Sequence, residues 1–419
     1  MCGIIGAFDR QRAPLGDELA RAACQRIAHR GPDDEGFFEA DGMLIGNRRL
    51  SILDLAGGHQ PMFSDDGQVA VVQNGEIYNF VELARGLGCR TTCDTEVLLR
   101  LYEREGDDFV RRLNGMFAIA IVDRRRRRLV LYRDRVGKKP LYLHDDGRRL
   151  LFASEIKSLL AMGVRPRLDW QALDALLTYN FVPPPVTLFE GVRHLMPGEM
   201  LAIDDAGVRT RRWWQLADAE PEEKSPDAWC DEILETLDDA VRIRLRSDVP
   251  LGAFLSGGID SSSVVALMSR QLDQPPRTFC IGFSDPRFDE SPHAAAVAER
   301  FGTRHTCERM QPDLMAVTIF ESSYDFEERL LSFPTRLDVI FLDIHIRPYS
   351  GFEMLEIIRS QGDFAEIPVV AITASVMNEE VQTLRNAGFD GVFSKPLDLD
   401  MFPDLLRRVL EGERVWYVM

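Results

Sequence analysis

The sequence predicts an α+β N-terminal domain of layered antiparallel sheets with helices, followed by two α/β segments with parallel sheets. Three observations support this prediction. Up to about residue 210, short β-rich stretches such as 115–123 and 128–134 are separated by turn residues. Beyond it, strands, glycine-containing loops and helices alternate, which is typical of parallel sheets. The alternation starts anew near residue 316, so we expect domains at 1–210, 220–314 and 316–419.

Within the N-terminal domain, further strands and helices are expected on either side of these two strands. Residues 139–145 have strand character, and residues 17–27 and 94–104 have helical character. Residues 180–191 contain three consecutive prolines, which exclude a helix and indicate an extended connector. The basic run 124–128 is expected to form a solvated turn between two strands.

The second and third segments each repeat the order strand, loop and helix. Ser225 followed by Pro226 predicts a helix N-terminus at the start of the second segment. The expected strands are 251–255, 278–283, 304–310, 317–322, 337–344, 367–374 and 391–396. The expected helices are 263–272, 293–302, 324–333, 352–360, 378–388 and 402–412.

The composition argues against several classes of protein. The 419 residues carry a net charge of −17, which argues against nucleic acid as a partner because phosphate binding needs clustered basic residues. No apolar run reaches the roughly 18 residues of a membrane span. The seven scattered cysteines, without a signal peptide, indicate reduced thiols and a cytoplasmic protein. Cys89 and Cys93 have no second pair at zinc spacing, which argues against zinc.

Cys2 is the first candidate catalytic residue in the sequence. If Met1 is removed, Cys2 becomes the N-terminal residue, and its α-amino group has a pKa of about 7.7–8.0. An amine with this pKa can act as general base for the adjacent thiol. The arrangement therefore suits acyl transfer through a thioester.

Several separate motifs accompany Cys2 in order along the chain. They are HRGPDDEG (29–36), RRLSILD (48–54), GHQPM (58–62), NGEIYN (74–79), CDTEVLL (93–99), RDRVGKKPLY (133–142) and FASEIKSL (152–159). Together they resemble the glutaminase domain of class II glutamine amidotransferases, which are N-terminal nucleophile (Ntn) hydrolases, and most closely that of asparagine synthetase. The resemblance covers nearly all of residues 1–205.

The resemblance implies a role for individual residues. Cys2 resembles the nucleophile that attacks the glutamine side-chain amide, and Asn74 with the N–H group of Gly75 resembles the oxyanion hole. Arg49 would hold the substrate α-carboxylate, and Glu76 and Asp94 would hold its α-ammonium group. The glutamine-binding set that the resemblance implies is Arg49, Leu50, Ile52, Asn74, Gly75, Glu76 and Asp94.

The string LSGGIDSS (255–262) lies between an expected strand and an expected helix. Glycines let the backbone approach a phosphate, and a helix N-terminus presents free N–H groups to it. With its flanks, the string resembles the pyrophosphate-binding loop of the asparagine synthetase ATP domain. The ATP-binding residues implied are Leu255, Ser256, Gly257, Gly258, Asp260, Ser261 and Ile281, with Mg²⁺ near Asp260. In the family this domain adenylates aspartate, and ammonia from the glutaminase site then forms asparagine.

The resemblance to the ATP domain stops after about Met310. The family's second loop, of the SGDGxDE type, and its catalytic lysine are not found, so we expect a truncated ATP-binding domain in 220–314. The amide acceptor stays open, and a β-lactam synthetase or another amide-forming relative remains an alternative.

In the third segment, polar residues end three successive expected strands: Asp343, Thr373 and Lys395. Such residues converge on one edge of a parallel sheet. The segment resembles the flavodoxin-like receiver domain of response regulators, with Asp343 as phosphoacceptor, Mg²⁺ nearby and a histidine kinase as partner. The first receiver strand, which carries two acidic Mg²⁺-binding residues, is missing, since the segment starts at 317–322.

Three functional hypotheses follow. The leading one is a glutamine-dependent asparagine synthetase-like enzyme that uses glutamine, aspartate, ATP and Mg²⁺. The second is a phosphorylation-responsive two-component signalling fusion that depends on Asp343. The third is an inactive chimera of partial domains.

Overall fold

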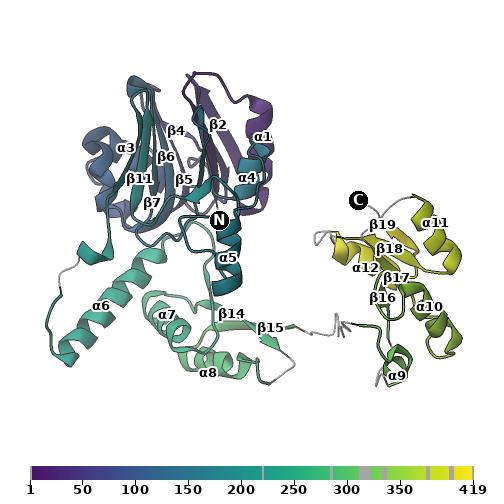
Figure 1. The fold of residues 1–419 in the computed structure, drawn as a ribbon. Coiled ribbons are helices and arrows are strands. Elements are labelled where there is room, and N and C mark those ends of the chain that lie inside the picture. The colour runs from purple at the N-terminus through teal and green to yellow at the C-terminus, as the bar shows by residue number, and fades with distance from the viewer. Residues whose placement is uncertain are drawn as a thin grey trace. The chain divides into compact units, whose positions relative to one another are not determined.

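The computed structural model describes residues 2–218, 221–283, 286–310, 322–332, 337–373, 378–395 and 401–417. It divides into two compact units, Met1–Gln311 and Pro312–Met419. Figure 1 shows the elements of each unit.

The first unit contains two six-stranded antiparallel sheets. The first has the strand order β10-β8-β9-β1-β3-β2 and the second has the order β12-β11-β7-β6-β5-β4. The predicted strands at 115–123 and 128–134 are confirmed as β6 and β7. The strands are β1 (Gly3–Asp9), β2 (Asp34–Ala40), β3 (Met43–Arg49), β4 (Met62–Phe63), β5 (Val69–Ile77), β6 (Gly115–Asp123), β7 (Arg128–Arg133), β8 (Tyr142–Asp145), β9 (Arg149–Ala153), β10 (Val192–His194), β11 (Glu199–Asp204) and β12 (Gly207–Arg212).

The two sheets stack face to face, with helices on both outer surfaces (Figure 1). Along β1, Ile4 and Phe8 pack toward the second sheet, while Ile5 and Ala7 pack toward α1 (Asp17–Gln25) and α4 (Ile156–Ala161). This alternation follows from the two-residue period of a strand. Because helices cover the outside of each sheet, the result is a four-layer α/β/β/α sandwich.

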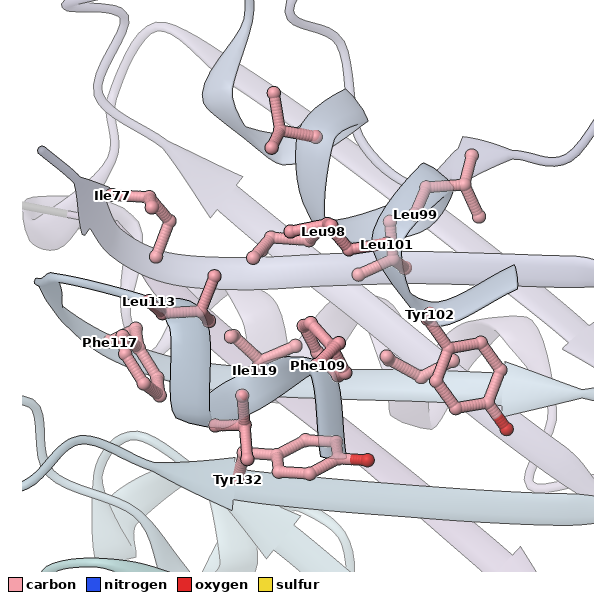
Figure 2. Packing of buried hydrophobic residues seen from close by; sticks show 14 of the residues in the cluster. Ile77, Leu98, Leu99, Leu101, Tyr102, Phe109, Leu113, Phe117, Ile119 and Tyr132 are labelled. Carbon is pink, nitrogen blue, oxygen red and sulfur yellow. The ribbon is translucent and has the colours of Figure 1, made fainter. Parts of the chain in front are cut away.

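The outer face of the second sheet is covered by α3 (Asp94–Glu105) and the 3-10 helix η2 (Gly106–Arg112). Figure 2 shows the aromatic centre of this layer, in which Phe109 packs edge-on against both Tyr102 and Tyr132. The ring centroids are 6.1 Å apart for Tyr102 and 5.3 Å apart for Tyr132. This packing fixes α3, whose first residue, Asp94, belongs to the cavity described below.

The smaller elements of this unit complete the N-terminal sandwich. They are η1 (Ala28–Arg30), α2 (Phe80–Ala84), η3 (Arg124–Arg126), α5 (Trp170–Tyr179) and η4 (Leu216–Asp218). Residues 180–191 contain no helix, as predicted.

The basic run does form the predicted turn, since η3 is followed by Arg127 in the left-handed conformation. The expectation that the whole turn is solvated is wrong for Arg127. Its residue exposure is 8%, its guanidinium lies 4.6 Å from the ring centroid of Phe8, and it donates to Asp9 O. A long arginine side chain can bury its stem in this way while its head group finds acceptors.

The remainder of the first unit is a three-stranded parallel sheet with helices, as predicted. Ser225 caps the first helix, because its Oγ accepts a hydrogen bond from Ala228 N at 3.2 Å. Alternate residues of the central strand are buried against the helices. The elements are α6 (Pro226–Arg244), β13 (Gly252–Phe254), α7 (Ile259–Gln271), β14 (Arg277–Phe283), α8 (Ser291–Phe301) and β15 (Arg304–Met310).

The second unit is a parallel sheet of order β16-β17-β18-β19 with four described helices. The final strand was not predicted, because three residues after a glycine turn give too short a pattern to assign. The expected strand at 317–322 lies outside the described residues, apart from Ser322. The elements are α9 (Phe326–Leu331), β16 (Ile340–Asp343), α10 (Gly351–Ser360), β17 (Val369–Thr373), α11 (Asn378–Ala387), β18 (Gly391–Ser394), α12 (Phe402–Leu410) and β19 (Val415–Tyr417).

The aromatic centre in Figure 2 generates a stability prediction. Replacing the fully buried ring in Phe109→Ala should lower the free energy of unfolding by about 3–5 kcal/mol, because a cavity replaces its contacts. Urea unfolding followed by tryptophan fluorescence checks this, since Trp213 lies in the same cluster. The control is Phe181→Ala, where the residue is 57% exposed. Equal shifts of the two unfolding midpoints would contradict the packing described.

Candidate functional site

A cavity of about 170 Å³ lies beside the start of β1. It is lined by residues from both sheets, from α3 and from the loops that follow β3 and β7. Of the residues that the sequence analysis assigned to glutamine, the cavity lining contains Cys2, Arg49, Leu50, Ile52, Gly75, Glu76 and Asp94. Asn74 neighbours the lining residue Gly75 but is itself fully buried.

Cys2 immediately precedes β1, so its position is set by the pairing of that strand. Its Sγ accepts a hydrogen bond from Leu50 N at 3.4 Å, and its carbonyl oxygen accepts one from Arg30 Nε at 2.9 Å. Burial raises the pKa of the Cys2 thiol, and the Leu50 N–H group offsets part of that rise. The thiol is therefore protonated near neutral pH and needs a base before it can attack.

Arg49 ends β3 and is 5% exposed. Its Nη2 donates to the carbonyl oxygens of Leu53 at 2.7 Å and Asp54 at 2.8 Å, so the loop after β3 fixes the guanidinium. Gly58 leaves the room for it, because a Cβ at that position would lie 1.9 Å from Arg49 Nη2. The arginine is thus a preorganised cation at the cavity wall.

Two carboxylates lie in the same cavity. Asp94 accepts hydrogen bonds at Oδ2 from Gln73 Nε2 (2.7 Å) and from Ile77 N (2.9 Å). Burial raises the pKa of the Asp94 carboxyl, and these donors oppose the rise. The pKa of Glu76 is also raised, first by burial and then by the charge of Asp94.

The two expected oxyanion-hole residues are consecutive on β5. Gly75 is required there, because a Cβ would lie 1.9 Å from Met116 O on the neighbouring strand. The Asn74 side-chain nitrogen lies 3.3 Å from Ser154 Oγ. Asn74 Oδ1 is buried and has no hydrogen-bond partner among the described residues.

The sequence analysis missed Lys139, which also lines the cavity and is only 4% exposed. Asp134 positions its loop by accepting hydrogen bonds from Phe117 N, Lys138 N and Lys139 N. Burial lowers the pKa of Lys139, and the charge of Glu76 is the largest opposing influence. In the sequence, Lys139 looks like its exposed neighbour Lys138, so no local signal separates the two.

The segment after α6 contacts the loop that lines this cavity. Asp248 N donates to Ile52 O at 3.0 Å, and Asp54 N donates to Asp248 Oδ2 at 2.6 Å. Arg246 Nη1 donates to Glu82 Oε2 at 2.7 Å, and this ion pair lowers the pKa of Glu82 to about 2. The α/β segment and the cavity are therefore joined by direct hydrogen bonds.

The glycine-containing loop between β13 and α7 has the geometry of a tight turn. Ser256 Oγ lies 3.1 Å from Ser261 Oγ, and Gly258 N donates to Ser256 Oγ at 3.3 Å. Gly257 has a φ of 83°, and a Cβ there would lie 2.5 Å from His293 Cβ, so glycine is needed. The first turn of α7 follows directly, and Asp260 in it is exposed.

Leu255 and Ile281, the two apolar residues among those expected to bind ATP, do not share a face of the parallel sheet. Leu255 is 2% exposed and packs with Val265 and Cys280 under the helices. Ile281 follows Cys280 on β14, so it lies on the opposite face and is 49% exposed. The structure brings the serines and glycines of the loop together, but not these two apolar side chains.

In the second unit, Asp343 and Thr373 end the neighbouring strands β16 and β17, and Lys395 directly follows β18. Lys395 Nζ forms an ion pair with Asp343 Oδ2 at 2.6 Å, and Lys395 N donates to Thr373 O at 2.8 Å. Burial opposes ionisation of Asp343, but the ion pair with Lys395 and the hydrogen bond from His345 N together lower the pKa of its carboxyl. A second acidic residue, Glu380, is near these strand ends, because its Oε1 lies 3.5 Å from Thr373 Oγ1.

The residues that the structure describes contain no group of three or more His, Cys, Asp or Glu side chains arranged to hold a metal ion. The expected Mg²⁺ near Asp260 and Asp343 therefore has no cage of protein ligands in that part of the chain. Among the described residues, no helix is both long enough and apolar enough to cross a membrane.

Three protein families match the chain. A glutamine amidotransferase domain matches residues 1–214, an asparagine synthase family matches 232–339, and a response regulator receiver domain matches 299–407. The last two matches overlap over residues 299–339. A solved glutamine phosphoribosylpyrophosphate amidotransferase from Bacillus subtilis, in complex with ADP and GMP, aligns with 100% of this chain and 91% of its own, with a TM-score of 0.39 and 16% identity.

Curated relatives match over most of this chain. Asparagine synthetase [glutamine-hydrolyzing] 1 of Bacillus subtilis is 36% identical over 323 residues, which cover 75% of this chain and 51% of the relative. Putative asparagine synthetase [glutamine-hydrolyzing] 2 of Methanocaldococcus jannaschii is 34% identical over 394 residues, covering 88% and 73%. The chain thus spans about half the length of the first relative and about three quarters of the second. On this evidence, the chain belongs to the glutamine-hydrolysing asparagine synthetase family, with a receiver-domain match joined to it.

Proposed function

We propose that residues 1–210 form a glutaminase domain that hydrolyses glutamine to glutamate and ammonia, with Cys2 as the nucleophile. The observation that carries this proposal is one cavity that gathers a thiol, an arginine and two carboxylates at the start of β1. A thiol alone would fit many reactions. A thiol beside groups that complement an amino-acid zwitterion favours a free amino acid as the substrate.

The charges of the cavity suit glutamine. Arg49 is the proposed partner of the α-carboxylate, since a guanidinium can hold a carboxylate with two parallel hydrogen bonds. Glu76 and Asp94 are the proposed partners of the α-ammonium group. Leu50 and Ile52 belong to the same lining and complete the proposed glutamine-binding set with Asn74 and Gly75.

The reaction proceeds through a thioester. After removal of Met1, the α-amino group of Cys2 accepts the thiol proton, and the thiolate attacks the side-chain carbonyl carbon. The Gly75 N–H group and the Asn74 amide stabilise the negative oxygen of the tetrahedral intermediate. The intermediate collapses, the nitrogen leaves as ammonia after taking up a proton, and water then hydrolyses the thioester to glutamate and free Cys2.

We further propose that residues 220–314 form a truncated ATP-binding domain that would adenylate aspartate for amidation to asparagine. Support comes from the loop of Ser256, Gly257, Gly258 and Ser261 at the N-terminus of α7, where free N–H groups suit phosphate. Mg²⁺ bound to substrate phosphates needs only one or two protein carboxylates, and Asp260 offers one. Leu255 and Ile281 remain proposed adenine contacts, and they would meet the base from different faces of the sheet.

The first test replaces the nucleophile. Cys2→Ala should abolish glutamate release from glutamine, because no other group in the proposal forms the thioester. A coupled glutamate assay on purified protein measures this. Cys230→Ala is the control, since Cys230 is exposed on α6 and should leave release unchanged. Equal glutamate release by wild type and Cys2→Ala would refute the proposed nucleophile.

The second test uses the buried lysine. Glu76 must be ionised to hold the α-ammonium group, and the positive charge of Lys139 favours that ionised form. The Lys139→Met variant lacks this positive charge, so the pKa of Glu76 should rise further. On acidification, Glu76 then becomes protonated at a higher pH than in wild type, and glutamine binding is lost there. The acid limb of kcat/KM should move up by about one pH unit.

The control for this pH profile is Lys138→Met, which removes an exposed lysine next in sequence and should leave the acid limb in place. Other charges that influence Glu76 are Asp94, Arg244 and the amino terminus, and neither variant changes them. A loss of activity in Lys139→Met that is uniform across pH would contradict the proposed electrostatic role.

A second candidate function belongs to residues 316–419, which we propose as a receiver-like domain that lacks its first strand and is phosphorylated on Asp343 by a histidine kinase. The observation that favours it is the ion pair between Lys395 and Asp343, with Thr373 on the strand between them. In a receiver domain the acidic pair that binds Mg²⁺ lies on the first strand, which we propose is missing here.

Acetyl phosphate tests this candidate directly. Wild-type protein should be labelled in the presence of Mg²⁺, and Asp343→Asn should remove the label because the acceptor carboxylate is gone. Asp338→Asn, at an exposed aspartate just before β16, should keep the label. No labelling of the wild type would exclude Asp343 as an acceptor from acetyl phosphate. Protein that neither releases glutamate nor takes the label would instead fit the inactive chimera.

A cytoplasmic location is part of the proposal as well. It is supported by the reduced cysteines expected from the sequence and by the seven free cysteines that the structure describes.

A further inference from the structure

We propose that Ser154 is a positioning residue of the glutaminase site, which orients the side-chain amide of Asn74 so that its N–H group serves the oxyanion. This inference rests on the proposed hydrolysis of glutamine at Cys2. Ser154 directly follows β9, Asn74 lies on β5, and the two belong to different sheets of the sandwich. The contact therefore joins the two sheets beside the nucleophile.

Ser154 is held firmly from the side of β1. It is fully buried, and its backbone N donates to Ile4 O at 2.9 Å. In return, Ile4 N donates to Ser154 Oγ at 2.9 Å. Ile4 is two residues after Cys2, so these reciprocal bonds fix the serine oxygen relative to the nucleophile.

The hydroxyl hydrogen of Ser154 then needs an acceptor. Within the described residues, the side-chain partner of Ser154 Oγ is the Asn74 amide, 3.3 Å away. If the amide nitrogen faces the serine, Ser154 Oγ accepts from both Ile4 N and Asn74 Nδ2. Its hydroxyl hydrogen then has no side-chain acceptor among the described residues, and Asn74 Oδ1 remains buried without a partner. A buried acceptor without a donor carries a free-energy cost.

The opposite amide orientation gives the hydroxyl hydrogen an acceptor and leaves the Asn74 N–H hydrogens for the oxyanion. Ser154 then donates its hydroxyl hydrogen to Asn74 Oδ1 while it continues to accept from Ile4 N. A serine hydroxyl provides one donor and two acceptor lone pairs, so it can make both bonds at once. The oxygen and nitrogen of an amide have nearly the same shape, so the hydrogen-bond network decides between the two orientations.

The orientation matters for the reaction. With its oxygen held by Ser154, the Asn74 amide directs its N–H groups away from the serine, where they can assist the adjacent Gly75 N–H group. The reversed amide would offer a carbonyl oxygen to a negative charge, which is repulsive. Ser154 therefore acts through Asn74 on the transition state, and it should affect kcat more than KM.

The experiment compares full-length Ser154→Ala with wild type in steady-state glutamate release. We expect kcat to fall by about 100-fold, the usual loss when one oxyanion-hole donor is removed, with KM changed by less than about threefold. Ser158→Ala is the matched control. Ser158 is also fully buried, and its hydroxyl donates to Ala23 O at 2.8 Å, outside the cavity lining. An unchanged kcat in Ser154→Ala overturns the inference.

A double-mutant cycle with Asn74→Ala separates positioning from general structure. If Ser154 acts through the amide, Ser154→Ala should lower kcat by less than about twofold once Asn74 is already alanine. An equal loss in both backgrounds overturns the inference. If Ser154→Ala does not fold, Ser154→Cys takes its place in the cycle, because a thiol is a weak donor of similar size.

The outcome for the proposed function is read separately. Glutamate release by wild type that is lost in Cys2→Ala supports the glutaminase assignment whatever Ser154 does. With that activity present, an unaffected Ser154→Ala fails the inference alone. Wild-type protein without any release fails the assignment and the inference together.

Discussion

The register of β1 is the constraint on which the candidate site depends. This strand pairs with β3 on one side, where Gly3 faces Arg48, and with β9 on the other, where Ile5 faces Ala153. Those registers place Cys2 beside the residues that follow β3 and Ser154 beside Ile4. Both faces of β1 are buried, and a slip of one residue would exchange the large pair Ile4 and Phe8 with the smaller pair Ile5 and Ala7, so the packing on both faces disfavours it. The sandwich thereby locates a thiol at a strand end without help from a flexible loop.

Charge balance is the second organising feature of the cavity. Two acidic side chains, Glu76 and Asp94, share it with two cations, Arg49 and Lys139. Burying like charges together is unfavourable, so each carboxylate needs either donors or an opposite charge nearby. Asp94 has the donors Gln73 and Ile77, whereas Glu76 is favoured by the lysine. The cavity is near neutral before a zwitterion enters it, and a zwitterion leaves that balance unchanged.

The sequence alone predicted the architecture of the sandwich, both parallel sheets and half of the cavity lining, because motifs such as NGEIYN keep several contacting residues on one short strand. It did not predict contacts that depend on long-range pairing. Ser154 and Lys139 look like ordinary polar residues until β9 and the loop after β7 are brought to Cys2. The burial of Arg127 against Phe8 and the separation of Leu255 from Ile281 were missed for the same reason. Periodicity gives the faces of one element, but not which neighbour covers them.

The hydrogen bonds between Asp248 and the Ile52–Asp54 loop have a thermodynamic consequence. The same short segment leads from α6 into β13 and the loop that we propose binds phosphate, so a few hydrogen bonds connect that segment to the loop lining the cavity. Linkage between two binding sites is reciprocal: the factor by which one ligand changes the affinity of the other is the same in both directions. Any coupling carried by Asp248 must therefore obey that equality. If both proposed sites are correct, glutamine would change the affinity for a nucleotide by the same factor as the nucleotide changes the affinity for glutamine.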